Sequence, residues 1–140
     1  MLVSVVVATR NRPELLRATL LALKAQTHQA LDVIVLDDGS SASARARYGD
    51  LWRELDERFR LVLQGQDGQR GQGPSASRNQ AIQCAQGELV AFCDDDDLWI
   101  DADHLRRAVS AFAAHPDLDL YISNQRVVYS DGAVREDWLP

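Results

Sequence analysis

Three largely apolar runs, each followed directly by a polar cluster, constrain the fold of this chain more than any other feature. They are LVSVVVA (residues 2–8), LDVIVL (31–36) and ELVAFC (88–93). Such runs, rich in β-branched and aliphatic side chains, are typical of strands buried on both faces of a parallel sheet. FRLVL (59–63) is a shorter run of the same kind. We therefore expect these four runs to be strands.

Helical patterns separate these runs. Leu16, Leu20 and Leu23 recur at i, i+4 and i+7, which predicts an amphipathic helix from Pro13 to about Gln26. Three further helices are expected: one that ends near Asp56, one from Pro74 to a stop at Gly87, and one that carries Leu105, Val109 and Phe112 and is closed by His115 and Pro116. Strands that alternate with helices at this spacing predict a parallel α/β sheet.

The remaining segments carry weaker signals. GQDGQRGQG (65–73) contains four glycines and no apolar side chain, so we expect a mobile loop. LDLYIS (118–123) and QRVVYS (125–130) are expected to be strands, with Asp131 and Gly132 as a turn. The sheet could therefore end in an antiparallel pair.

Length and charge narrow the class of protein. With 140 residues, the chain has the usual size of one domain. Its net charge of −6 argues against nucleic acid as a partner. The charge is local, because six aspartates lie among residues 94–103, a stretch without Lys or Arg.

The cysteines and the N-terminal segment indicate in which cellular compartment the protein resides. Cys84 and Cys93 form no CxxC motif and have no metal-ligand spacing, so we expect free thiols in a reducing environment. The run of residues 2–8 is too short to cross a membrane, and Arg10 and Arg12 follow it, whereas a signal peptide has its basic residues first. We expect a cytoplasmic domain with no transmembrane segment, which a partner could hold at the inner face of the membrane.

Polar clusters at residues 9–12, 37–41 and 94–97 follow three of the predicted strands. In parallel α/β sheets, ligands bind beyond the carboxyl ends of the strands. The cluster 94–97 is either a solvated acidic turn that caps the next helix or a cation site. If strand alternation continues, Asp94 and Asp96 point to the same side, which suits Mg²⁺ or Mn²⁺.

Three known carboxylate motifs can be compared with the acidic run, residues 94–97. A calcium loop that begins at Asp94 would need Gly and Glu where Trp99 and Leu105 stand. A receiver domain would need a lysine after a later strand, but the only lysine is Lys24. A dehalogenase-type phosphatase stays open, although Leu98 stands where its motif usually carries Thr or Val.

Taken together, SVVVATRNRPELL, VIVLDDGSS and SASRNQAIQCAQGELVAFCDDDDLW resemble family 2 glycosyltransferases of the GT-A fold, a three-layer α/β/α Rossmann-like architecture. The resemblance implies that Ala8, Thr9 and Arg10 line the base and ribose of a nucleotide-sugar, and that Asp38 bonds the nucleobase or ribose. Helix capping is the alternative role for one of Asp37 and Asp38.

The resemblance also assigns the acidic run to an Asp-x-Asp motif. It implies that Asp96 and Asp94 are ligands of Mg²⁺ or Mn²⁺, with Asp96 the stronger candidate. Asp94 and Asp95 are also expected at the nucleotide-sugar, with Asp95 at its ribose or sugar, while Asp97 caps a helix or stays solvated. Arg78 either faces phosphate or forms an ion pair with the acidic run; both alternatives stay open.

The implied reaction is transfer of a sugar, with inversion, from a UDP-sugar or related donor to a hydroxyl of a glycan, lipid or other acceptor. The chain then corresponds to a single nucleotide-sugar-binding domain, residues 1–140, without the acceptor-binding half. We expect the catalytic base beyond Pro140, because Glu136 and Asp137 follow Asp96 too soon. A non-catalytic nucleotide-binding module is the main alternative, and an uncovered sheet edge could support a homodimer.

Overall fold

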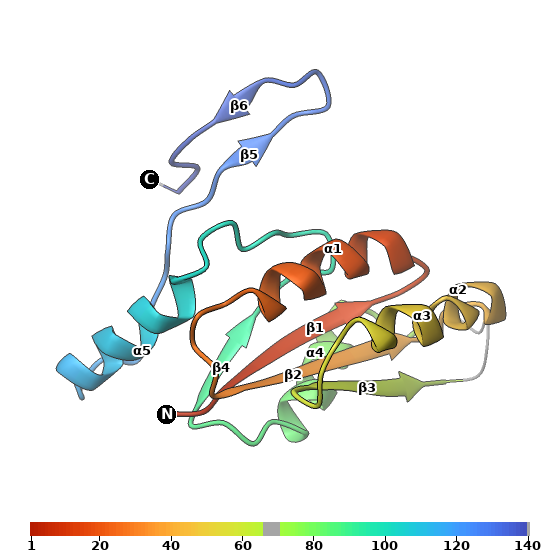
Figure 1. The fold of residues 1–140 in the computed structure, drawn as a ribbon, viewed down its shortest axis with the longest axis horizontal. Helices are drawn as coiled ribbons and strands as arrows, with labels where there is room; N and C mark the ends of the chain where they lie inside the picture. The colour runs from red at the N-terminus through yellow and green to blue at the C-terminus, as the bar shows by residue number, and fades with distance from the viewer. Residues whose placement is uncertain (66–70, 140) are drawn as a thin grey trace. The chain divides into compact units, whose positions relative to one another are not determined.

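The computed structural model describes residues 1–65 and 71–139, in two compact units, Met1–Arg107 and Ala108–Pro140. The first unit contains a four-stranded sheet in the order β3-β2-β1-β4, with every neighbouring pair parallel (Figure 1). The strands are β1 (Val3–Thr9), β2 (Leu31–Asp38), β3 (Phe59–Gln64) and β4 (Leu89–Phe92). The predicted parallel α/β architecture is confirmed.

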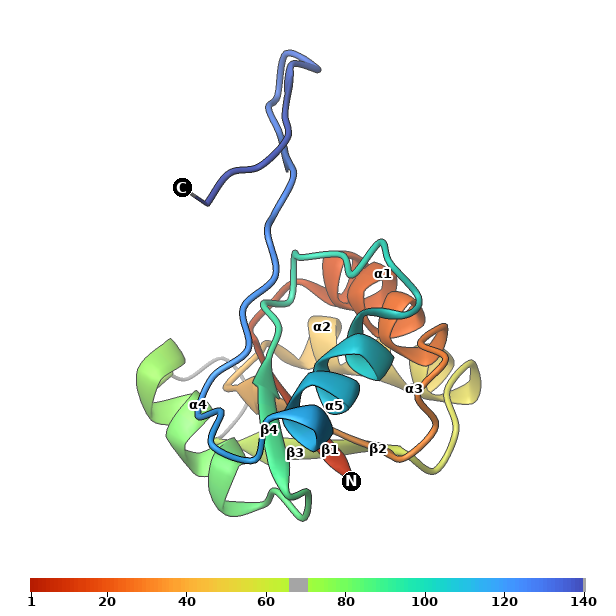
Figure 2. The same cartoon turned by 90° about the vertical axis from the view of Figure 1, so that its left-hand side faces the viewer.

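The central strands β1 and β2 are buried along nearly their whole length, as their apolar sequences predict. Helix α1 (Pro13–Lys24) lies on one face of the sheet and α4 (Pro74–Gln83) on the other (Figure 2). The three predicted leucines of α1 are fully buried, and each contributes about 1.5–3 kcal/mol. On the opposite face, Ala81 packs against Ile34 and Leu36. The core therefore holds β1 and β2 firmly.

Strand β4 is an edge strand and ends at Phe92, before the acidic run. The next residues form a turn, in which the Asp97 N–H donates to the Asp94 carbonyl at 3.1 Å. The strand alternation does not extend into the turn, so alternation is not what directs Asp94 and Asp96 to the same side.

The segment between β2 and β3 contains two short helices, α2 (Ala42–Ala46) and α3 (Tyr48–Arg53), and not one helix that ends near Asp56. The break between them places the Tyr48 hydroxyl against the Asp37 carboxylate, at 2.5 Å. A buried polar contact thus accompanies the interruption of the predicted helix.

The cap of α2 is also different from the prediction. Ser41 occupies the N-cap position, and its hydroxyl accepts a hydrogen bond from the Ala44 N–H at 3.3 Å. The expectation that Asp37 or Asp38 caps this helix is wrong, because other donors bind both carboxylates.

Gly87 does not terminate α4, which ends four residues earlier, at Gln83. A Cβ atom on Gly87 would lie 2.6 Å from the Leu2 carbonyl oxygen and 2.6 Å from the Ser4 nitrogen. Glycine is needed at this position because the chain passes close to β1, and not because a helix stops there.

The second unit departs most from the prediction. Helix α5 (His104–Ala114) begins in the first unit and ends just before His115, as expected. Strands β5 (Val127–Val128) and β6 (Val134–Arg135) pair antiparallel around the predicted turn at Asp131 and Gly132. The segment 125–130 forms a strand only at β5.

The predicted strand at 118–123 is absent from the structure. Its apolar side chains Leu120 and Ile122 are 66% and 67% exposed, and no strand of the described residues pairs with the segment. An alternating pattern forms a strand only where a neighbouring strand supplies the hydrogen bonds.

Three further predictions concern the cysteine thiols, membrane-spanning segments and the glycine-rich loop. Cys84 and Cys93 are both free, as predicted. No helix among residues 1–65 and 71–139 is long and apolar enough to cross a membrane. Most of the expected mobile loop at 65–73 cannot be compared, because residues 66–70 lie outside the described residues.

Candidate functional site

The carboxyl ends of β1, β2 and β4 meet at one edge of the sheet, beside a cavity of about 430 Å³. All eight predicted site residues line this cavity: Ala8, Thr9, Arg10, Asp38, Arg78, Asp94, Asp95 and Asp96. Four residues that were not predicted complete the lining: Arg12, Gly73, Pro74 and Ser77. The structure therefore brings the predicted residues together, as expected for strand ends of a parallel sheet.

Asp37, the first aspartate at the end of β2, is fully buried. Its carboxylate accepts hydrogen bonds from Arg45 Nη2 at 2.7 Å, the Tyr48 hydroxyl at 2.5 Å and the Ser40 N–H at 3.0 Å. Burial alone would raise the pKa of Asp37, but these hydrogen bonds outweigh it and hold the pKa below its usual value. Asp37 is a charged structural anchor behind the cavity.

Asn11 and Ser40 connect the end of β1 to the end of β2. The Asn11 N–H donates to Ser40 Oγ at 2.8 Å, and the Ser41 N–H donates to Asn11 Oδ1 at 2.8 Å. Asn11 has a φ of +56°, in the left-handed region that asparagine tolerates better than most residues. These contacts fix the two strand ends that form one side of the cavity.

Asp38, the second aspartate, lines the cavity and binds the chain that leads into α4. Its two carboxylate oxygens accept hydrogen bonds from the Gln72 and Gly73 N–H groups, both at 2.8 Å. A Cβ atom on Gly71 would lie 2.6 Å from the Asp38 carbonyl oxygen, so glycine is needed for this approach. Each carboxylate oxygen keeps a second lone pair with which it can accept a hydrogen bond from a ligand.

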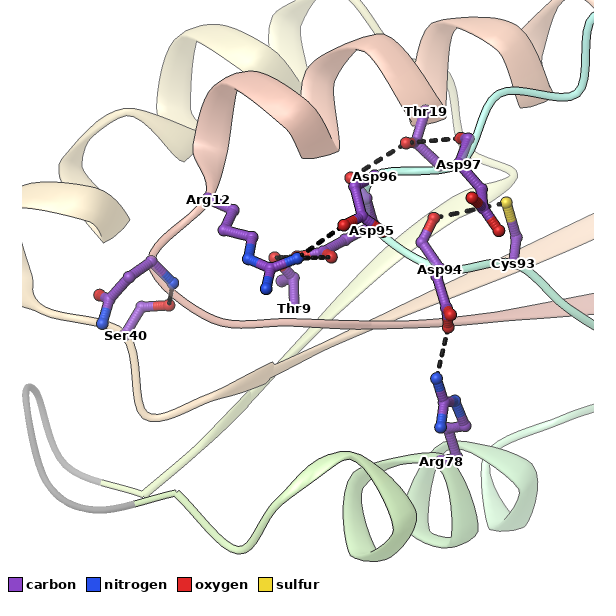
Figure 3. A network of polar contacts seen from close by, with 11 residues as sticks. Thr9, Arg12, Thr19, Ser40, Arg78, Cys93, Asp94, Asp95, Asp96 and Asp97 are labelled. Carbon is purple, nitrogen blue, oxygen red and sulfur yellow. Dashed lines mark hydrogen bonds and ion pairs between the residues drawn. The ribbon is translucent and has the colours of Figure 1, made fainter. Parts of the chain in front are cut away.

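The acidic turn forms the other side of the cavity (Figure 3). The buried Asp95 carboxylate accepts a hydrogen bond from Thr9 Oγ1 at 2.7 Å. Arg12 Nη1 bridges two carboxylates, at 3.2 Å from Asp95 Oδ1 and 2.9 Å from Asp96 Oδ2. The Thr19 hydroxyl lies 3.0 Å from the Asp95 carbonyl oxygen. Contacts from β1 and α1 thus hold this turn.

Arg78 approaches the turn from the α4 side and forms an ion pair with Asp94 (Figure 3). Of the two alternatives predicted for Arg78, the ion pair is present, and contact with phosphate stays a prediction. Arg107 and Arg106 likewise pair with Asp101 and Asp103. The stretch 94–103 contains no basic residue, but arginines from outside it compensate much of its charge.

Asp97 is exposed and does not cap a helix, because α5 begins only at His104. The predicted helix cap is therefore wrong, and the predicted solvated position is correct. Partial burial raises the pKa of Asp97, and the charges of Asp94 and Asp96 add to this increase. Burial, together with the same acidic turn, raises the pKa of the Cys93 thiol to about 12, so Cys93 is a protonated, inert side chain.

The sequence matches one family over almost its whole length. The family model described as Glycosyl transferase family 2 covers residues 4–138. The chain belongs to this family. EpsH of Bacillus subtilis (strain 168) is 33% identical over 129 residues, which make up 92% of this chain and 35% of EpsH.

Two solved structures of glycosyltransferases share the fold. TarS 1–349 of S. aureus, in complex with UDP-GlcNAc, has a TM-score of 0.69 and 27% identity, over 83% of this chain and 32% of its own. The mannosyltransferase PcManGT of Pyrobaculum calidifontis, in complex with GDP-Man and Mn²⁺, has a TM-score of 0.65 and 30% identity, over 79% of this chain and 32% of its own. The family 2 chain thus has a GT-A fold and spans about a third of the length of these relatives.

The carboxylates of the family 2 site fit a divalent ion that is coordinated partly by the protein and partly by a bound ligand. Asp94 and Asp96 are hard oxygen donors with half-exposed side chains. Within residues 1–65 and 71–139, no three His, Cys, Asp or Glu side chains are grouped so that they could hold an ion alone. Mg²⁺ is usually held by one or two carboxylates together with substrate phosphates. The arrangement suits that mode of binding.

Sequence reasoning missed two polar residues of the family 2 cavity. Arg12 belongs to the polar cluster after β1, and its charge is opposite to that of the acidic run, which was the available signal. Ser77 is fully buried in α4, and its Oγ has no hydrogen-bond partner among the described residues. No sequence pattern singled out Ser77, because a serine in a helix is ordinary.

Proposed function

We propose that this chain is the nucleotide-sugar-binding part of a glycosyltransferase that transfers a sugar from a UDP-sugar to an acceptor hydroxyl with inversion. The observation that carries the proposal is the position of all eight predicted residues around one cavity at the carboxyl edge of the sheet. The complexes of TarS with UDP-GlcNAc and of PcManGT with GDP-Man and Mn²⁺ support a nucleotide-sugar donor and a divalent ion.

The two sides of the cavity suit the two ends of such a donor. On one side, Ala8, Thr9 and Arg10 would line the base and ribose, and Asp38 would accept a hydrogen bond from a uracil-type N–H. This side is held by fixed backbone and side-chain hydrogen bonds, which favours recognition of a planar base.

The acidic turn suits the diphosphate end of the donor. Asp94 and Asp96 would hold Mg²⁺ or Mn²⁺, with Asp95 near the ribose or sugar and Arg78 near phosphate. A bound ion offsets the negative charge that develops on the leaving nucleoside diphosphate. The residues of this chain would orient the diphosphate so that the anomeric carbon is open to attack by the acceptor.

The acceptor hydroxyl attacks the anomeric carbon, and a carboxylate takes its proton. We place this base in the part of the enzyme beyond Pro140, and not at Glu136 or Asp137. The acceptor is a glycan, a lipid or another hydroxyl compound. The homodimer and the cytoplasmic location stay predictions.

Calorimetric titration of the chain with UDP, in the presence and absence of Mn²⁺, tests this proposal. We expect Mn²⁺ to strengthen UDP binding, and Asp96→Asn to weaken Mn²⁺-dependent binding by about tenfold or more, because a charged ligand is lost. Asp50→Asn is the matched control, since Asp50 is an exposed aspartate paired with an arginine outside the cavity.

Competition between UDP and GDP tests which nucleobase the site prefers. A preference for UDP over GDP supports the UDP-sugar assignment, and a preference for GDP would replace it. Absence of nucleotide binding with and without Mn²⁺, in a chain whose circular dichroism shows it to be folded, would contradict the donor site itself.

A further inference from the structure

Arg12 occupies one of the carboxylate oxygens to which a divalent ion could bind. Its Nη1 atom lies 2.9 Å from Asp96 Oδ2, the strongest predicted metal ligand, and 3.2 Å from Asp95 Oδ1. The Arg12 side chain is 50% exposed and lines the cavity. A cation cannot approach this Asp96 oxygen from the same direction while the guanidinium remains there, because both are positive and need the same lone pair.

The charge of the whole cavity bears on the competition between Arg12 and a divalent ion. Its lining carries four carboxylates and three guanidiniums, so its net charge is only −1. A divalent ion alone would change that balance to a net positive charge, and an ion at Asp96 would leave Arg12 with one of its two carboxylate partners. A nucleoside diphosphate supplies phosphate oxygens that arginine binds well.

We propose that Arg12 is a positioning residue that couples metal binding to nucleotide binding. Without nucleotide, its guanidinium competes with the divalent ion for Asp96. When the ion and the diphosphate bind together, Arg12 leaves the carboxylates and pairs with phosphate. This inference rests on the proposed function, because it requires both ligands in this cavity.

The exposure of Arg12 makes such an exchange feasible. A half-exposed ion pair is a weak contact, so a ligand can replace it at small cost. Coupling of this kind is reciprocal: UDP strengthens Mn²⁺ binding by the same factor by which Mn²⁺ strengthens UDP binding. Arg12 would contribute to that factor in two ways, by weakening the binding of Mn²⁺ alone and by strengthening the joint binding.

Arg12→Gln separates these contributions. We measure Mn²⁺ binding by electron paramagnetic resonance with and without saturating UDP, for the wild-type chain and the variant. We expect Mn²⁺ alone to bind about three- to tenfold more tightly to Arg12→Gln, because the competing charge is gone. The coupling factor should fall by more than that ratio, because the pairing of Arg12 with phosphate is lost as well. Arg12→Lys retains the charge and should bind Mn²⁺ alone nearly as weakly as the wild type.

Arg17→Gln is the matched control. Arg17 also lies on α1, its side chain is 48% exposed, and it pairs with Glu54 outside the cavity. It should leave both Mn²⁺ affinities unchanged. Unchanged or weaker binding of Mn²⁺ alone to a folded Arg12→Gln variant would overturn the inference, as would an unaltered coupling factor. If the wild-type chain binds no Mn²⁺ even with UDP, the proposed function fails, and this inference fails with it.

Discussion

Two aspartates at the carboxyl edge of the sheet, Asp37 near the end of strand β2 and Asp97 in the turn after β4, lie in opposite environments. Asp37 is fully buried, yet hydrogen bonds from Arg45 and Tyr48 keep its pKa low. Asp97 is exposed, yet partial burial and two neighbouring carboxylates raise its pKa. The difference shows that the donors around a carboxylate, and not its depth alone, decide whether its charge stabilises the fold.

The same contrast divides the cavity. The side formed by β1 and β2 depends on directional hydrogen bonds to groups that are buried or belong to the backbone. In the side formed by the acidic turn, Asp94 and Asp96 form ion pairs with partly exposed arginines. The first kind of contact is costly to break, and the second can be exchanged for contacts with a ligand. The β1–β2 side is therefore suited to binding a ligand of fixed shape. The acidic turn is suited to replacing its ion pairs by contacts with a charged ligand.

The largest effect on stability is expected when the buried contacts of Asp37 are broken. Asp37→Asn removes the negative partner of Arg45, whose side chain is only 13% exposed. Loss of one partner of a buried ion pair costs about 3–5 kcal/mol, and we expect the free energy of unfolding in urea to fall by that amount. If Asp37→Asn does not fold, Tyr48→Phe removes one hydrogen bond to the same carboxylate and should cost about 1.5–3 kcal/mol.

The pH dependence distinguishes a charge effect from a packing effect at Asp37. The folded-state pKa lies below the unfolded value of about 3.8, so the stabilisation is complete above that value and is lost as the pH falls through the folded pKa. The stability difference between wild type and Asp37→Asn should therefore be constant from neutral pH to about pH 5, and narrow below pH 4. A difference that stays constant down to pH 2 would contradict an ionised Asp37.

The sequence predicted the part of the fold that depends on local pattern. Runs of β-branched residues identified the buried strands, and the leucine spacing identified α1. The site followed from topology, because carboxyl ends of adjacent parallel strands converge whatever their separation along the chain. This is why residues as distant as Thr9 and Asp95 could be expected in one cavity.

The features that could not be predicted depend on contacts between distant side chains. Arg12 carries the opposite charge to the acidic run, but no local pattern indicates that this arginine, more than 80 residues away, would neutralise part of it. The turn between α2 and α3 brings Tyr48 to Asp37, a contact without a periodic signal. The segment 118–123 has the pattern of a strand but lacks a partner strand among the described residues.

A smaller effect is expected where Asp38 meets the chain before α4. Gly71→Ala would place a methyl group against the Asp38 backbone and carboxylate, and such overpacking costs about 1–3 kcal/mol. Because Asp38 must shift, the affinity for UDP should fall together with the stability. Gly49→Ala is the matched control. Gly49 lies in α3, and apart from its chain neighbours and its own helix backbone no described atom lies within 4 Å of an added Cβ, so this change should be neutral or stabilising. Equal effects of the two substitutions on UDP affinity would contradict the role given to this contact.

The smallest effect, with the opposite sign, is expected at Asp97. Asp97→Asn removes one of the charges that repel each other in the turn, while its backbone carbonyl still accepts a hydrogen bond from Thr19 Oγ1. The free energy of unfolding, measured at neutral pH with EDTA, should rise by no more than about 0.5 kcal/mol, because the site is exposed and screened by salt. The gain should shrink further in 1 M NaCl. Asp37→Asn and Asp97→Asn are the same chemical change, so a loss of stability in both would mean that the exposed turn, like the buried anchor, depends on each of its charges.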